Sequence, residues 1–72
     1  MQQDHHIFLF QALKKLPAEQ RYLIEKAFLE GFTHQELADT MAIPLGTIKT
    51  RIRTGMKTLR HELAFMENDY AL

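Results

Sequence analysis

The stretch EGFTHQELADTMAIPLGTIKTRIRTGMKTLR, residues 30–60, decides the fold. It contains Thr33-His-Gln-Glu36, the Ser/Thr-x-x-Glu pattern of a capping box, in which two side chains satisfy each other's backbone amides at a helix start. Pro44 then separates a short helix from a long one, because the residue before a proline avoids the α region. A short helix, a tight turn and a second helix are typical of a helix-turn-helix, which we favour over a plain helical bundle with the same pattern.

The rest of the chain is also helical in pattern, because no stretch alternates with a period of two residues. Asp4 is the expected N-cap of the first helix, Pro17 separates the first helix from the second, and Gly31 is the expected C-terminal cap of the second. We therefore expect an all-α, four-helix domain of residues 1–72 without winged elements. The expected helices cover residues 5–16, 18–30, 34–42 and 45–66, followed by a tail at 67–72.

Apolar residues recur at helical spacing and predict the core. Ala38 places a small side chain where the two helices of the helix-turn-helix must cross closely. The second helix offers a stripe of Ile24, Ala27 and Phe28. The remaining core candidates are Leu37, Met41, Ile43, Ile48, Ile52, Met56, Leu59 and Leu63.

The charge is balanced overall but uneven along the chain. Nine basic and nine acidic residues give a net charge of zero, which alone argues against a nucleic-acid binder. By position, residues 1–43 hold four basic and six acidic groups, residues 44–61 hold five basic groups and no acid, and residues 62–72 hold three acidic groups. The net charge of zero is therefore the sum of a strongly basic segment and the acidic segments on either side of it.

The basic segment falls largely on one face of the fourth expected helix. At about 100° per residue, Lys49, Arg53, Lys57 and Arg60 share an outward face with Thr50. Such a face fits the major groove of DNA. A merely solvated face is the alternative, but no acids are interleaved to form the i,i+4 pairs of a solvated helix. The face also begins at the helix start, where recognition helices contact base edges.

Other chemistries find little support in the residues. His5 and His6 are adjacent and cannot face one metal from a helix, while His34 and His61 lack companions at ligand spacing. There is no cysteine, glycine-rich phosphate loop or recognisable catalytic arrangement, so we expect no enzyme, no cofactor and no metal site. No apolar run reaches the ~18 residues of a membrane span and no signal peptide is present, so we expect a cytoplasmic protein without membrane partners.

Three motifs resemble region 4, the C-terminal DNA-binding region of bacterial extracytoplasmic-function sigma factors. They are LP at 16–17, ELA at 36–38 and PLGTIKTR at 44–51, and the resemblance covers about residues 10–63. It implies recognition of the upstream, minus-thirty-five promoter element in double-stranded DNA. It also implies docking on the β flap of RNA polymerase to direct transcription initiation.

The resemblance carries roles to individual positions. Lys49 and Thr50 match the main base- and phosphate-contacting residues, and Arg53 matches a further groove-facing position. His34 and Gln35 match positions near the DNA backbone, where the amides of a helix N-terminus can hold a phosphate. The expected DNA-binding residues are His34, Gln35, Thr47, Lys49, Thr50, Arg53 and Lys57.

The sequence also departs from the family pattern. Thr54 and Met56 stand where relatives often have Arg, which makes the basic surface thinner. Ala42 occupies a turn position that often carries Gly and costs on the order of 1 kcal/mol if its φ is positive. Gly55 lies inside a helix at a cost of roughly 1 kcal/mol, so it either permits a close contact or weakens the helix. The family's promoter-melting region has no counterpart in these residues, so we expect an excised domain or a free-standing protein.

Apolar residues at both ends exceed what a minimal domain of this type buries. We expect Phe65 and Met66 to belong to a partner-binding patch for the polymerase flap, an anti-sigma factor or a second copy in a homodimer. An alternative function is a free-standing protein-interaction module that binds polymerase or an anti-sigma factor with weak DNA contact. A response-regulator output domain of the LuxR type shares Thr-Ile-Lys at 47–49 and ranks last, because other parts of that pattern are unmatched.

Overall fold

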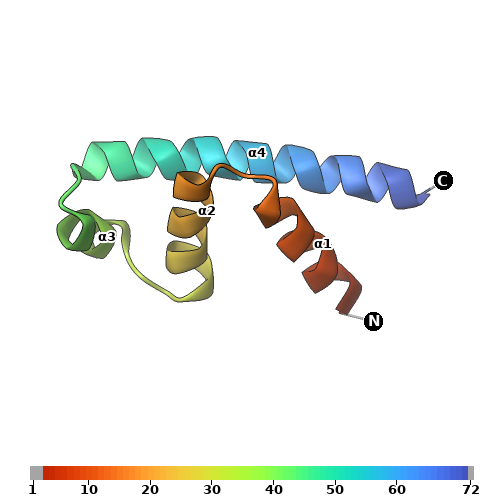
Figure 1. Ribbon diagram of the computed structural model, residues 1–72, viewed down its shortest axis with the longest axis horizontal. Helices are drawn as coiled ribbons and strands as arrows, with labels where there is room; N and C mark the ends of the chain where they lie inside the picture. The colour runs from red at the N-terminus through yellow and green to blue at the C-terminus, as the bar shows by residue number, and fades with distance from the viewer. Residues whose placement is uncertain (1–2, 72) are drawn as a thin grey trace.

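A computed structural model describes the backbone of residues 3–71 and the side chains of residues 8–66. It contains helices α1 (Gln3–Lys14), α2 (Ala18–Ile24), α3 (His34–Met41) and α4 (Leu45–Ala71), and a single π-helical segment, η1 (Glu25–Leu29), continues α2. No strand occurs within residues 3–71, which confirms the predicted all-α class. The long helix α4 runs the length of the molecule, and the other helices lie along one side of it (Figure 1).

The core consists of two clusters that share α4. The α1 cluster joins α1 to the second half of α4, and the turn cluster joins α2, α3 and the first half of α4. Met56 packs against both clusters, so α4 connects them. The buried members of the α1 cluster are Ala12, Leu13, Leu16, Ile24 and Leu59, and those of the turn cluster are Leu23, Leu37, Ala38, Ile48 and Ile52.

The predicted start of α3 is confirmed atom by atom. The Glu36 amide donates to Thr33 Oγ1 at 3.0 Å, and the Thr33 amide donates to Glu36 Oε1 at 2.8 Å, which completes the capping box. Before α4, the Pro44 carbonyl accepts from the amides of Thr47 and Ile48 at 3.0 and 3.1 Å. Both helices of the helix-turn-helix therefore begin at the positions that the local sequence specifies.

The turn between α3 and α4 carries backbone strain. Ala42 lies in the left-handed region with φ 55° and ψ 44°, and the Ile43 amide donates to the Ala38 carbonyl at 3.1 Å. An L-residue with a Cβ pays on the order of 1 kcal/mol in this conformation. The condition under which Ala42 carries a cost, a positive φ, is therefore met, and Gly31 is confirmed as a helix cap, with φ 83°.

Phe28 is not in the core, because its side chain is 57% exposed. The Glu30 amide donates to the Glu25 carbonyl at 3.1 Å, five residues back, in a π turn. A π turn takes more residues per turn than an α turn, so the residues after Ile24 move around the helix axis. Ile24 stays buried, whereas Phe28 turns outward, and the predicted stripe was wrong at that residue.

Three helix boundaries differ from the prediction by two residues or more. Residue Asp4 lies inside α1, which includes Gln3, so Asp4 is not the N-cap. At the other end, α1 stops at Lys14, and i→i−3 bonds from Lys15 and Leu16 tighten its last turn. The predicted tail at 67–72 was wrong, because α4 continues to Ala71; no Gly or Pro follows Gly55 to interrupt it.

Candidate nucleic-acid interface

The outward face of α4 carries the basic residues. Lys49, Thr50, Arg53 and Lys57 are all exposed, as is Arg60. The opposite side of the same helix is anchored in the two clusters by Ile48, Ile52 and Leu59, which are at most 5% exposed. This anchoring fixes which face of α4 meets solvent, and from Lys49 to Lys57 the face extends about 12 Å along the helix axis at 1.5 Å per residue.

The cations on this face have no acidic partner among the side chains that the structure describes. Among the side chains of residues 8–66, the salt bridge found joins Lys26 to Glu30 at 3.0 Å, far from the α4 face in sequence. The basic groups of α4 therefore remain available to an external anion. Phosphate groups of a duplex are suited to such a surface, because each neutralised phosphate releases a condensed counterion.

The residues expected near the DNA backbone lie at the start of α3. His34 is half-buried and Gln35 is exposed, but the side-chain Nε2 of Gln35 already donates to Asp39 Oδ1 at 2.9 Å. The Glu36 carboxylate of the capping box lies at the same helix end. A carboxylate there opposes the attraction of the helix N-terminus for a phosphate, so α3 offers a weaker phosphate site than its position implies.

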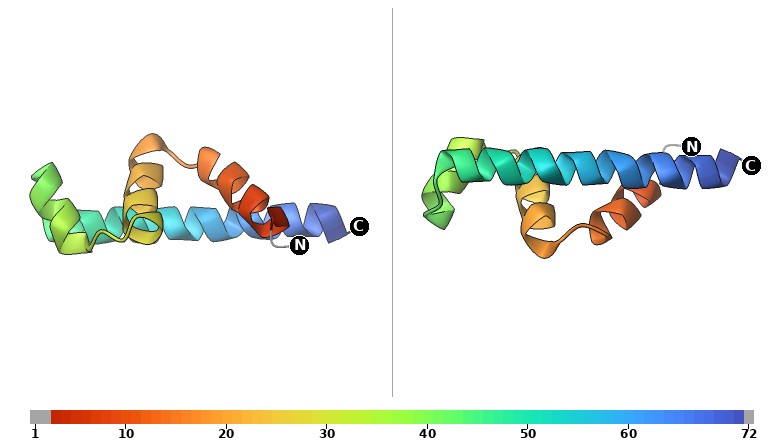
Figure 2. Two further views of the ribbon diagram at one scale, coloured as in Figure 1. Left: turned by 90° about the horizontal axis from the view of Figure 1, so that it is seen from below. Right: turned by 90° about the horizontal axis from the view of Figure 1, so that it is seen from above.

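The helix-turn-helix brings α3 and the first turns of α4 to one end of the molecule, as all three views agree (Figures 1 and 2). Leu37 and Ala38 of α3 pack with Ile48 and Ile52 of α4 in the turn cluster. Thr47, half-buried in the first turn of α4, lies within this assembly. Lys57 lies farther along α4, so it extends the face away from the turn.

The loop that leads into α3 is held by one cation. Lys26 Nζ lies 5.5 Å from the ring centroid of Tyr22 and 5.6 Å from that of Phe32. Its hydrogen bond to Glu30 raises the pKa of Lys26 above the usual 10.5, so this residue stays charged at neutral pH. The contact with Phe32 restrains the chain just before the Thr33 cap.

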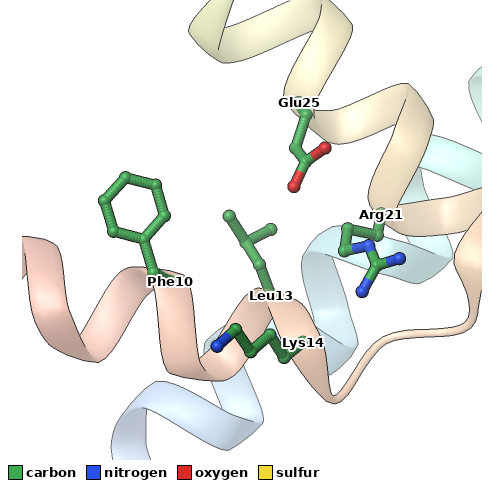
Figure 3. A pocket seen from close by; sticks show the side chains of 5 residues that line it. All are labelled: Phe10, Leu13, Lys14, Arg21 and Glu25. Atoms are coloured by element: carbon green, nitrogen blue, oxygen red, sulfur yellow. The ribbon is translucent and has the colours of Figure 1, made fainter.

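A second surface lies between α1 and α2. This α1–α2 groove has a volume of about 490 Å³ and is lined by Phe10, Leu13, Lys14, Arg21 and Glu25. Figure 3 shows Leu13 and Glu25 pointing toward each other across the groove, with Phe10 and Arg21 on either side. This groove was not predicted from the sequence; the signal available there was the surplus of apolar residues near the N-terminus, among which Phe10 is 55% exposed in the structure.

Phe65 and Met66, the expected partner-binding patch, differ in their exposure to solvent. Phe65 is 66% exposed, whereas Met66 is half-buried and packs against the α1 cluster. Phe65 is therefore the member of the pair that is open to a partner.

The described residues form neither a metal-binding cluster nor a membrane-spanning helix. No three His, Asp or Glu side chains among them gather as a metal site. None of the helices they form is both long enough and apolar enough to cross a membrane.

Comparison with known proteins places this geometry in a family. Residues 12–61 match the family described as "Sigma-70, region 4". The chain is 47% identical over 62 residues to the ECF RNA polymerase sigma factor RpoE of Cereibacter sphaeroides. The matched stretch covers 86% of this chain and 34% of that protein.

Other relatives agree. The ECF RNA polymerase sigma factor SigE of Mycolicibacterium smegmatis is 38% identical over 74% of this chain and 21% of its own length. The ECF RNA polymerase sigma factor SigW of Bacillus subtilis is 36% identical over 74% of this chain and 28% of its own length. The chain thus spans about a third or less of these three relatives' length. With two thirds of its residues matched in order and the helix-turn-helix in place, the chain belongs to the sigma-70 region 4 family and resembles this region of ECF sigma factors.

Proposed function

We propose that this chain is the promoter-recognition module of an ECF sigma factor. It binds the upstream, minus-thirty-five element of double-stranded DNA and docks on the β flap of RNA polymerase, in the cytoplasm, to direct transcription initiation. The observation that carries the proposal is the unpaired basic face of α4, which begins directly after the helix-turn-helix turn. Family membership supports the same function.

DNA recognition is assigned to the first half of α4. Placed in the major groove, Lys49 and Arg53 reach guanine O6 and N7 or phosphate oxygens, and the Thr50 hydroxyl can donate or accept at a base edge. Lys57, two turns beyond Lys49, contacts phosphate and fixes the register of the helix on the duplex. His34, Gln35 and Thr47 contribute backbone contacts at the turn end of the interface.

Polymerase docking is assigned to the α1–α2 groove. A helix in a groove is held by apolar anchors along one face. Leu13 provides the floor and Phe10 one wall, while Lys14, Arg21 and Glu25 supply a charged rim that can orient the occupant. A flap helix with an apolar anchor fits this combination, and an anti-sigma factor would compete for the same surface.

A protein-interaction module with weak DNA contact is the alternative. Two observations favour it: the net charge of zero, and the carboxylate of Glu36 at the end of α3 that would approach a phosphate. On this alternative, Phe65 and the α1–α2 groove carry the function, and the basic face of α4 adds only non-specific attraction.

The test begins with selection from randomised duplexes to find the preferred site. The chain is then titrated with that duplex and with a scrambled one at about 50 and 200 mM salt. Promoter recognition predicts preference for the selected duplex, a steep loss of affinity with salt, and loss of preference in Lys49→Glu. Lys15→Glu makes the same charge change in the turn that follows α1 and should keep the preference. Equally weak binding to both duplexes, together with tight binding to a flap peptide, would support the alternative.

A further inference from the structure

A second groove lies between α1 and α4. This α1–α4 groove has a volume of about 540 Å³ and is lined by Gln11, Lys14, Lys15 and Met66. Both lysines are exposed, no acid lines the groove, and neither lysine has a salt bridge to any side chain of residues 8–66. The groove is therefore a cationic surface with an apolar side chain and an amide beside it, and no acid among the side chains of residues 8–66 forms a salt bridge with its lysines.

The opposite charge lies on the last turns of α4. The helix continues to Ala71, and residues 62–71 contain Glu62, Glu67 and Asp69 without any Lys or Arg. The C-terminal end of a helix carries the negative end of the helix dipole, so acids there are unfavourable and cations from outside are favourable. The acidic end of α4 (residues 62–71) therefore also lacks compensation within its own last turns.

We propose that the α1–α4 groove receives the acidic end of α4 from a second copy of this chain. The groove is lined from α1, the turn after it and the second half of α4, and the acidic end also belongs to the second half of α4. Figure 1 shows α1 and this part of α4 in the same half of the molecule. In a two-fold symmetric pair, each acidic end therefore meets the partner's Lys14 and Lys15 at the same time. Charge complementarity supports a second copy as the occupant, because the chain carries both the basic groove and the acidic helix end.

The same half of α4 also supplies apolar surface for the pair. Phe65 is 66% exposed, more than any other large apolar side chain among the described residues, and it lies within the acidic end. Burying such a ring against a second copy removes apolar area from water, which is favourable. The first half of α4, with Lys49, Arg53 and Lys57, stays outside this interface, so pairing and DNA binding are compatible.

The test reverses the charge of the groove and the charge of the acidic end in separate variants of the 72-residue chain. The groove variant carries Lys14→Glu and Lys15→Glu, and the helix variant carries Glu67→Lys and Asp69→Lys. Sedimentation equilibrium should show self-association of the unmodified chain that weakens at high salt. Each variant alone should self-associate about tenfold less or worse, because like charges then face each other. Lys57→Glu, on the opposite face, should leave self-association unchanged, and circular dichroism checks that every variant is folded.

Mixing the two variants gives the decisive result. On one side of the pair the acidic groove of the groove variant then faces the basic helix end of the helix variant, and on the other side the unchanged basic groove faces the unchanged acidic end. The mixture should therefore form a heterodimer although neither component pairs alone. A mixture that stays monomeric would overturn the proposal. The proposal would also be overturned if the unmodified chain stayed monomeric at millimolar concentration, or if both variants kept the self-association of the unmodified chain. None of these readouts depends on DNA binding.

Discussion

A Cβ atom on Gly55 of α4 would lie 2.7 Å from Cδ1 of Ile24 on α2, closer than two carbons can approach. The same Cβ would lie 3.1 Å from Cβ of Gln20. The α2 helix therefore crosses α4 directly over the glycine, at the boundary between the two core clusters. Of the two alternatives for Gly55, the structure supports the close contact, which offsets the cost of roughly 1 kcal/mol for glycine in a helix.

This contact predicts a difference between two identical substitutions in α4. Gly46→Ala meets nothing within 4 Å and should stabilise the chain by up to about 1 kcal/mol through helix propensity. Gly55→Ala gains the same propensity but forces Ile24 to move, so its free energy of unfolding should be lower than that of Gly46→Ala by about 1 kcal/mol or more. Urea denaturation measures both, and equal stabilisation by the two variants would contradict the close crossing.

The strained turn predicts a stabilising change. Ala42→Gly should raise the free energy of unfolding by about 0.5–1 kcal/mol, because glycine adopts φ 55° without a Cβ clash. The matched control is Ala64→Gly on the exposed side of α4, where the same substitution should destabilise by up to about 1 kcal/mol. Two changes of the same sign in thermal or urea denaturation would argue against strain at the turn.

The capping box predicts an effect on DNA affinity. Glu36→Gln keeps an acceptor for the Thr33 amide but removes a negative charge from the α3 end expected near the phosphates. Duplex affinity should rise severalfold, on the order of the 0.3–1 kcal/mol of one charge at a helix end. Asp39→Asn makes the same charge change farther along α3 and should raise affinity less. A duplex titration in which Glu36→Gln has no effect would place the start of α3 away from the backbone.

The α1–α2 groove predicts a separation of binding from stability. Phe10 is 55% exposed, so Phe10→Ser should change the free energy of unfolding by only about 1 kcal/mol or less. The same variant should lose most of its affinity for a polymerase flap peptide, measured by fluorescence anisotropy, while its DNA affinity stays the same. Phe28→Ser, at an aromatic residue of similar exposure on η1, serves as the control. Equal loss of flap affinity in both variants would reject the groove as the docking site.

Local signals in the sequence predicted much of the helix-turn-helix, because its determinants lie within a few residues of each other. The Thr33–Glu36 box depends on residues three apart and was confirmed, whereas the positive φ of Ala42 was considered only as a condition, which the structure meets. The stripe of α4 was also predictable, since a regular helix repeats its faces.

The sequence-based predictions were wrong or incomplete at features that depend on more than the local sequence. The exposed side chain of Phe28 lies in the π-helical segment η1, and the periodicity of a regular α-helix does not predict such a segment. The α1–α2 groove depends on the relative placement of two helices, which periodicity within each helix does not encode. The DNA contacts of Lys49, Thr50 and Arg53 remain predictions: they are exposed on the right face, and exposure alone does not identify a ligand.

The central claim is that the first half of α4 contacts promoter DNA, and an NMR titration of the labelled chain with its selected duplex tests it most directly. The account predicts that the largest amide and side-chain shifts fall on Lys49, Thr50, Arg53 and Lys57, with smaller ones at the start of α3. Shifts that cluster instead on α1 or around the α1–α2 groove, with the α4 face unchanged, would contradict it.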